Sequence, residues 1–125
     1  MNQNGTIDLT INQLESNQGV VRILVFSSAK GFPEDRGQAV RALSIPIQDK
    51  QARTQIKNLP RGTYAISAFH DEDEDGKIKK NMVGFPQEKY GFSKNPGNKY
   101  SIPKFNRCAV SVSSDRIKEI RINLR

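Results

Sequence analysis

The sequence predicts an all-β protein, a single antiparallel β-sandwich of about seven strands. Apolar and polar residues alternate with a period of two along most of the chain, and Gly and Pro separate the alternating segments. The one segment with helical character, residues 34–43, follows Pro33 and contains Gly37, and both residues weaken a helix. A chain of 125 residues suffices for one hydrophobic core, so we expect one domain at residues 1–125.

The first half of the chain contains three of the expected strands. Residues 6–12 alternate strictly between apolar and polar side chains, which is typical of a half-buried strand. Residues 20–27 are apolar on both faces and rich in β-branched residues, which indicates a central strand. Residues 40–47 alternate again, but Pro46 cannot donate a backbone hydrogen bond, so we expect an edge strand or a strand that ends there.

The second half closes the predicted sandwich. Residues 54–59 and 63–70 are two alternating segments joined by a turn that contains Pro and Gly. Gly and Pro interrupt residues 71–106 throughout, so we expect a long irregular loop, of a length that is usually functional or mobile. Residues 107–113 and 117–124 are expected to form a closing hairpin. Its inward-facing residues would be Cys108, Val110, Val112, Ile120, Ile122 and Leu124.

Charge is distributed unevenly along the chain. Lys and Arg number 20 against 13 Asp and Glu, for a net charge of +7. Five acids stand consecutively at residues 71–75, and residues 77–107 then carry eight Lys or Arg and a single Glu. Such basicity bears on solubility and partners rather than on the fold. Because only 35% of the residues are hydrophobic and no long apolar run exists, we expect no transmembrane segment.

His70 and Cys108 are the only histidine and the only cysteine of the chain. One of each excludes an internal disulfide and a metal site built on several Cys or His ligands. His70 ends a strand beside carboxylates, where an imidazole can act as a general base, but no nucleophile or orienting partner accompanies it. We therefore expect His70 to hydrogen-bond a neighbouring loop and Cys108 to be a small buried residue, in a protein that is not an enzyme.

The acidic run matches a known calcium-binding pattern. Residues 71–78 read Asp-x-Asp-x-Asp-Gly-x-Ile, like the opening of an EF-hand-type loop. Alternate side chains on a tightly turning backbone direct their oxygens to one centre, and calcium takes about six to eight such ligands. No helices are expected beside this loop, so a true EF-hand is excluded. The expected ligands are Asp71, Asp73, Asp75, the backbone carbonyl of Lys77, and Asn81.

The second half of the pattern departs from a calcium loop. Lys79 and Met82 stand where oxygen ligands are expected. Two interpretations therefore stay open: a calcium site that attaches the long loop to the sandwich, and a solvated acidic turn neutralised by nearby lysines.

The basic segment 77–107 also contains five of the nine aromatic residues. Aromatic rings interleaved with cations can stack on bases or sugars while the cations hold phosphates, which suits an anionic polymer such as a glycan or a nucleic acid. The competing interpretation is that the rings anchor the loop and the lysines form its solvated face. The residues expected to bind such a ligand are Lys80, Lys89, Tyr90, Phe92, Lys94 and Tyr100.

Two segments resemble known families. Residues 56–66, Ile-Lys-Asn-Leu-Pro-Arg-Gly-Thr-Tyr-Ala-Ile, resemble the hairpin of transthyretin-like and carboxypeptidase-regulatory-like β-sandwiches. Residues 68–95 begin with Ala-Phe-His-Asp and contain Asp-Gly-Lys-Ile at 75–78, Gly-Phe-Pro at 84–86 and Tyr-Gly-Phe-Ser at 90–93. This longer segment resembles the bacterial family called domain of unknown function 2141, and the strands on either side also fit that family.

The resemblance implies a transthyretin-like (prealbumin-like) fold and a small exported protein, periplasmic or secreted, without an established activity. Where that family commonly has a carboxylate after the Gly-Lys-aliphatic step, this chain has Lys79. Residues 1–5 show neither a basic nor an apolar signal segment, so the chain as given is not expected to be a secretory precursor. A cytoplasmic protein and a mature exported form therefore stay open, and the sequence indicates no oligomeric state.

Overall fold

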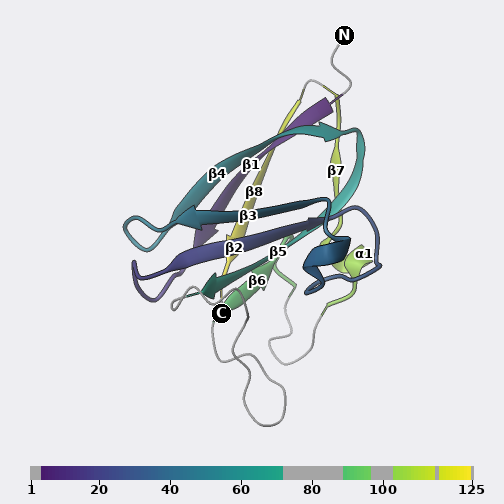
Figure 1. Cartoon of the computed structure of the whole chain (residues 1–125). Coiled ribbons are helices and arrows are strands. Elements are labelled where there is room, and N and C mark those ends of the chain that lie inside the picture. Colours follow the sequence, from purple (N-terminus) through teal and green to yellow (C-terminus); the bar gives the residue numbers. More distant parts are fainter. Residues whose placement is uncertain (1–3, 72–88, 97–102, 115, 125) are drawn as a thin grey trace.

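The computed structural model describes residues 4–71, 89–96, 103–114 and 116–124, and this part of the chain is all-β (Figure 1). It forms eight strands in two sheets, with two short helical turns. The strands are β1 (Asn4–Asn12), β2 (Val20–Phe26), β3 (Arg41–Pro46), β4 (Ala52–Pro60), β5 (Gly62–Asp71), β6 (Tyr90–Phe92), β7 (Val110–Val112) and β8 (Ile117–Asn123). The helical turns are the 3-10 turn η1 (Arg36–Gln38) and the α-helical turn α1 (Phe105–Cys108).

The two sheets have different strand orders. One has three strands in the order β4-β1-β8, and the other has the order β3-β2-β5-β6, with β7 pairing along the start of β5. β3 ends at Pro46 and lies at an edge of its sheet, as the missing backbone donor predicts. β8 is an edge strand of the three-stranded sheet and carries exposed charged residues, which discourage pairing with other chains.

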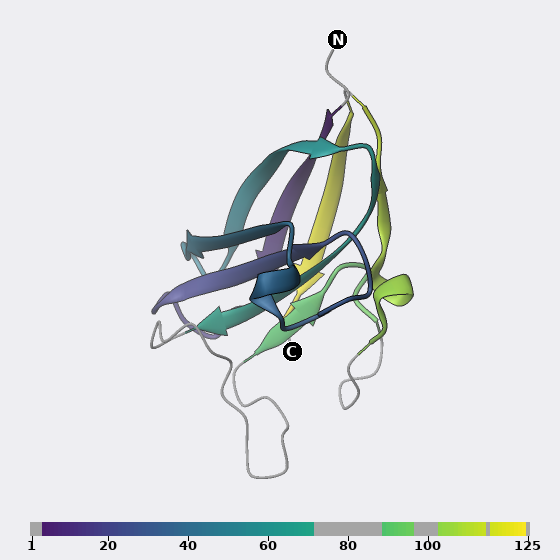
Figure 2. The same cartoon turned by 45° about the vertical axis from the view of Figure 1, so that its right-hand side comes forward.

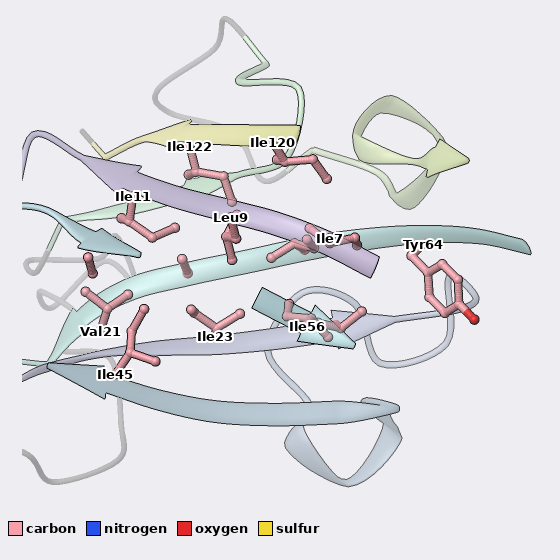
Figure 3. Close-up of a cluster of buried hydrophobic side chains, with 14 of the residues drawn as sticks. Ile7, Leu9, Ile11, Val21, Ile23, Ile45, Ile56, Tyr64, Ile120 and Ile122 are labelled. Atoms are coloured by element: carbon pink, nitrogen blue, oxygen red, sulfur yellow. The ribbon is translucent and has the colours of Figure 1, made fainter. Parts of the chain in front are cut away.

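The hydrophobic core lies between the inner faces of the two sheets (Figure 3). Burial alternates residue by residue along β1 and along most of β2, as a period of two requires. All six residues expected to point inward near the C-terminus are buried. The largest fully buried aliphatic side chains come from both sheets: Ile7, Leu9, Ile11, Val21, Ile23, Val25, Leu59, Ile66, Ile122 and Leu124.

The expected closing hairpin is wrong. β7 pairs antiparallel with β5 in one sheet, whereas β8 pairs parallel with β1 in the other. The sheets are therefore not purely antiparallel, and the strands number eight rather than about seven in the described residues. Residues 105–108, expected to be in or next to a strand, form the turn α1. Alternation identifies a strand and its inner face, but it does not specify which strand lies beside it.

The region 71–106 is also not wholly irregular. Within it the structure describes β6, which pairs with β5 from Ser67 to Phe69, and the start of α1. Gly91 lies in the middle of β6, and a Cβ atom there would come 2.6 Å from Cγ2 of Ile122 in the opposite sheet. Glycine is required at this close approach, which supports the interpretation that the aromatic residues on either side of it anchor the region.

The segment between β2 and β3 folds back over the outer face of the five-stranded sheet (Figure 2). The hydroxyl of Ser67 on β5 donates a hydrogen bond to the carbonyl oxygen of Pro33 at 2.7 Å. This contact holds the segment against the sheet. Side chains are therefore packed in two places, between the two sheets and beneath this segment. No helix in the described residues is long and apolar enough to cross a membrane.

Candidate functional site

The acidic run begins at an ion pair on the outer face of the five-stranded sheet. Arg22 Nε of β2 donates to Asp71 Oδ2 at 2.9 Å, and Arg22 Nη1 donates to Ser44 Oγ of β3. The register of β2 and β5 explains the contact. Arg22 pairs with Phe69, and Asp71 lies two residues further along β5, so Arg22 and Asp71 are diagonal neighbours on the same face. Asp71 is fully buried and the Arg22 side chain is 25% exposed. The first acid is therefore held by a fixed cation.

His70 faces away from this ion pair. Consecutive residues of a strand point to opposite faces, so the imidazole and the Asp71 carboxylate lie on different sides of β5. His70 is 1% exposed, and its Nε2 lies 2.7 Å from the carbonyl oxygen of Gln18 in the β1–β2 loop. The histidine thus makes the loop contact that was expected, and Asp71 does not orient its ring.

Four aromatic side chains, Phe26, Phe32, Phe92 and Phe105, form a cluster beneath the segment between β2 and β3, which we call the outer aromatic cluster. Phe32 is at its centre, with ring centroids 5.4 Å from Phe26 and 6.0 Å from both Phe92 and Phe105. Edge-on and tilted packing of this kind is favourable beyond the area it buries. The cluster fastens two segments outside the strands, those of Phe32 and Phe105, to the sheet through Phe26 and Phe92, which supports the anchoring interpretation of Phe92.

Other residues of the predicted ligand-binding set have structural contacts too. Lys89 Nζ donates to the carbonyl oxygen of Gln13 at 3.1 Å and lies 3.9 Å from Glu15 Oε1, so it ties β6 to the β1–β2 loop. The rings of Tyr90 and Phe92 lie 5.5 Å apart. Lys94 is exposed, and its φ of 67° places it in the left-handed region.

Cys108 lies below the surface at the end of α1. It is fully buried, and the Ser93 hydroxyl donates to its backbone carbonyl oxygen. Burial raises the pKa of the Cys108 thiol to about 11, while the positive charges of Arg107 and Lys94 partly oppose that increase. These two exposed cations therefore lie near the same buried thiol. The raised pKa favours a neutral, unreactive side chain, as the sequence predicts.

A small hollow of about 60 Å³ lies beside Arg22 on the outer face. Besides Arg22, its charged lining consists of Arg36 and Glu34. A hollow of this size holds about two water molecules and is far smaller than the ~300–1,000 Å³ of usual small-molecule sites. Its lining carries two arginines and Glu34, and one of the arginines, Arg22, is already paired with Asp71.

Several predicted site residues lie outside the described part of the chain: Asp73, Asp75, Lys77, Lys80, Asn81 and Tyr100. Of the expected metal ligands, only Asp71 is described. Among the described residues, no group of three or more His, Cys, Asp or Glu side chains is placed to hold a metal ion. The sequence analysis missed Arg22 and Phe32, since their partners are distant in sequence and neither residue belongs to a motif.

A family model described as "Uncharacterized protein conserved in bacteria (DUF2141)" matches residues 9–120. The matched range extends from within β1 to within β8 and includes the acidic run, the basic segment and the outer aromatic cluster. No curated protein and no solved structure matches the chain. The family description states no activity, so a function has to be argued from the residues.

Proposed function

The chain belongs to the uncharacterised bacterial family DUF2141, and from that premise we propose a non-enzymatic, exported domain that binds calcium through the acidic residues 71–75. In this proposal the two sheets form a transthyretin-like β-sandwich in the periplasm or outside the cell. The structural roles of His70 and Cys108 support a non-enzymatic function, because His70 is buried and hydrogen-bonded to a loop and the Cys108 thiol is buried with a raised pKa. The resemblance to exported relatives supports the location.

The single observation that carries the cation proposal is the Arg22–Asp71 ion pair. It attaches the first acid of the run to a buried position on the sheet, so the loop starts from a rigid point. Arg22 supplies one positive charge to a run of five acids. Each close pair of like charges costs on the order of 1 kcal/mol even in water, and a divalent cation would remove that repulsion.

Arg22 also affects how an ion would bind. Its guanidinium already occupies Oδ2 of Asp71, so a cation would compete for that carboxylate oxygen. We therefore assign the main ligand role to Asp73 and Asp75, with the carbonyl of Lys77 and the side chain of Asn81 completing the site. Asp71 then serves as the fixed end of the loop.

Thermal unfolding of the full chain in EDTA, in calcium and in magnesium tests this proposal. Calcium at a hundredfold excess over its Kd should add ~2.7 kcal/mol to the free energy of unfolding, which raises Tm by roughly 2–8 °C per kcal/mol. The Asp73→Ala/Asp75→Ala variant should lose the response. The matched control, Asp8→Asn/Glu119→Gln, removes two acids from the three-stranded sheet and should keep it. An unchanged Tm at millimolar calcium contradicts the proposal, and a response that survives in Asp73→Ala/Asp75→Ala places the ion elsewhere.

A second candidate function is binding of an anionic polymer through the basic aromatic segment 77–107. The observation that favours it is the position of two exposed cations. Lys94 follows Phe92 by two residues, Arg107 follows Phe105 by two residues, and both cations lower the pKa of the Cys108 thiol. A titration with a single-stranded polyanion at low and at physiological salt tests it. Specific binding should persist at physiological salt and weaken in Lys94→Gln/Arg107→Gln, whereas binding that disappears with salt is non-specific attraction.

A further inference from the structure

The outer edge of β3, the last strand of the five-stranded sheet, directs backbone groups away from the sheet (Figure 1). In an antiparallel sheet, successive residues of a strand bond to opposite neighbours. The N–H of His70 donates to Lys89 O at 2.9 Å, so the even-numbered residues of β5 bond toward β6 and the odd-numbered residues bond toward β2. The registers carry this alternation across β2, so the odd-numbered residues of β3 bond to β2. Ala42, Ser44 and Pro46 therefore direct their backbone groups outward.

Two backbone donors are free along this edge. Pro46 has no N–H, and the N–H of Val40 at the other end of the strand already donates to Val25 O at 2.8 Å. The N–H groups of Ala42 and Ser44 remain, and no described part of the chain bonds to them. Both side chains are small and exposed, so neither prevents another strand from approaching. Such an edge is a template for a further strand.

β4, which follows β3 in the chain, does not take the place of that further strand. It belongs to the other sheet, and no described residue of β4 pairs with β3. Arg41 Nη2 donates to Asn58 O at 3.0 Å at one end of β3, and the tight turn at residues 48–51 connects the two strands at the other end. The backbone of Ala42 and Ser44, between these two contacts, stays open.

A second copy of β3 complements this edge. In antiparallel orientation about a two-fold axis at Leu43, Ala42 of each copy lies opposite Ser44 of the other. Each such pair exchanges two N–H···O=C bonds, so the free donors of both copies are all used. The same register places Val40, which is 40% exposed, opposite Pro46. Neither of these two residues has an outward donor, so their apolar side chains meet without leaving an N–H unpaired.

A register shifted by two residues, with Ser44 opposite Ser44, is less favourable. It directs the ring of Pro46 at the carbonyl oxygen of Ala42, where a hydrogen-bond donor is needed. The register centred on Leu43 instead places Pro46 at the end of the ladder, where β3 itself ends.

We infer that residues 42–44 at the edge of β3 form a self-association site, at which two copies of the chain pair β3 with β3 and join their five-stranded sheets into one. The partner that this surface fits is the same strand in antiparallel orientation. The acidic run takes no part, so the inference does not depend on calcium binding. Because the open edge is short, the dimer should be weak and should form as the concentration rises.

The mass of the full chain in EDTA, measured by sedimentation equilibrium from about 1 μM to about 1 mM, tests the inference. The wild type should pass from monomer to dimer within this range. Ala42→Lys/Ser44→Lys places like charges opposite each other twice and should weaken the dimer by about tenfold or more. Ala42→Lys/Ser44→Glu changes the same positions but pairs opposite charges, so it should keep the dimer. Gln55→Lys on the edge strand β4 is the control and should behave as the wild type.

Disulfide cross-linking tests the register. Cα atoms of a hydrogen-bonded antiparallel pair lie about 5.5 Å apart, within the range that a disulfide spans, whereas diagonal neighbours lie about 7–8 Å apart. A mixture of Ala42→Cys chains and Ser44→Cys chains should therefore cross-link on oxidation, and neither variant should do so alone. Cys108 is buried and stays out of the reaction.

Three results would overturn the inference. The first is a wild type with the monomer mass at all concentrations. The second is equal self-association of the two double variants when circular dichroism shows both to be folded. The third is cross-linking of Ala42→Cys alone as fast as that of the mixture.

Discussion

The space between the two sheets and the outer face of the five-stranded sheet are stabilised in different ways. Between the sheets, aliphatic side chains from alternating strands pack into one cluster, with a buried residue at every second position of β1. On the outer face, stability comes from a few particular contacts, the Arg22–Asp71 ion pair and the outer aromatic cluster around Phe32. The stability of the inner region is shared among many aliphatic residues. The stability of the outer region depends on single partners contributed by segments far apart in sequence.

The largest effect is expected in the core. Leu9 is fully buried at the middle of β1, opposite Thr54 of β4 and Ile120 of β8. Leu9→Ala removes buried apolar surface and leaves a cavity between the two sheets, which the surrounding structure fills only in part. It should therefore lower the free energy of unfolding by about 2–5 kcal/mol. Urea denaturation measures it, with Thr10→Ala on the outer side of the same strand as control. A loss for Leu9→Ala no larger than that of the control would contradict a core closed at this position.

A smaller but sharper effect is expected at the outer ion pair. Arg22→Met leaves the Asp71 carboxylate buried without its cation and should cost about 2 kcal/mol, below the usual range for a buried pair because Arg22 is 25% exposed. Removing the acid as well, in Arg22→Met/Asp71→Leu, should recover much of that loss. Arg53→Met is the matched control, because its pair with Asp8 at 3.8 Å is exposed and worth about 0–1 kcal/mol. Equal losses from Arg22→Met and Arg53→Met would show that the outer pair is not a special anchor.

The smallest effect concerns the Cys108 thiol next to the outer aromatic cluster. Burial raises its pKa from 9.0 to about 11, so the unfolded chain loses this proton at a lower pH than the folded chain does. The contribution of Cys108 to stability is therefore fully present below pH 9 and is lost as the pH rises toward 11. At pH 8 the thiolate fraction in the folded state is about a hundredfold lower than in the unfolded state.

Alkylation by iodoacetamide at pH 8, with and without urea, measures this difference. Lys94→Gln removes one of the two cations that lower the pKa, so it should slow the reaction of the folded chain further. Equal rates in the folded and the unfolded chain would show that Cys108 is neither buried nor perturbed.

Much of the fold was predictable because it depends on local alternation. The expected segments correspond to β1 to β5, the end of β3 at Pro46 follows from its missing N–H, and the inner faces of the C-terminal strands are as predicted. Anchoring by the aromatic residues was one of two interpretations that the sequence left open, and the close approach of Gly91 to Ile122 supports it. Of the candidate site, the engagement of His70 by a loop was expected, whereas the cation and polymer functions remain proposals.

By itself, then, the sequence determined that the protein is all-β, where its main strands lie and which of their faces are apolar, because side-chain direction repeats every two residues within a strand. Only the tertiary structure decided that β8 joins β1 in parallel while β7 joins β5, and that Arg22 meets Asp71 from 49 residues away. Neither pairing has a local signature, since backbone groups bond equally well to any strand. The choice among partners depends on how loops return the chain and on which arrangement buries every apolar face at once.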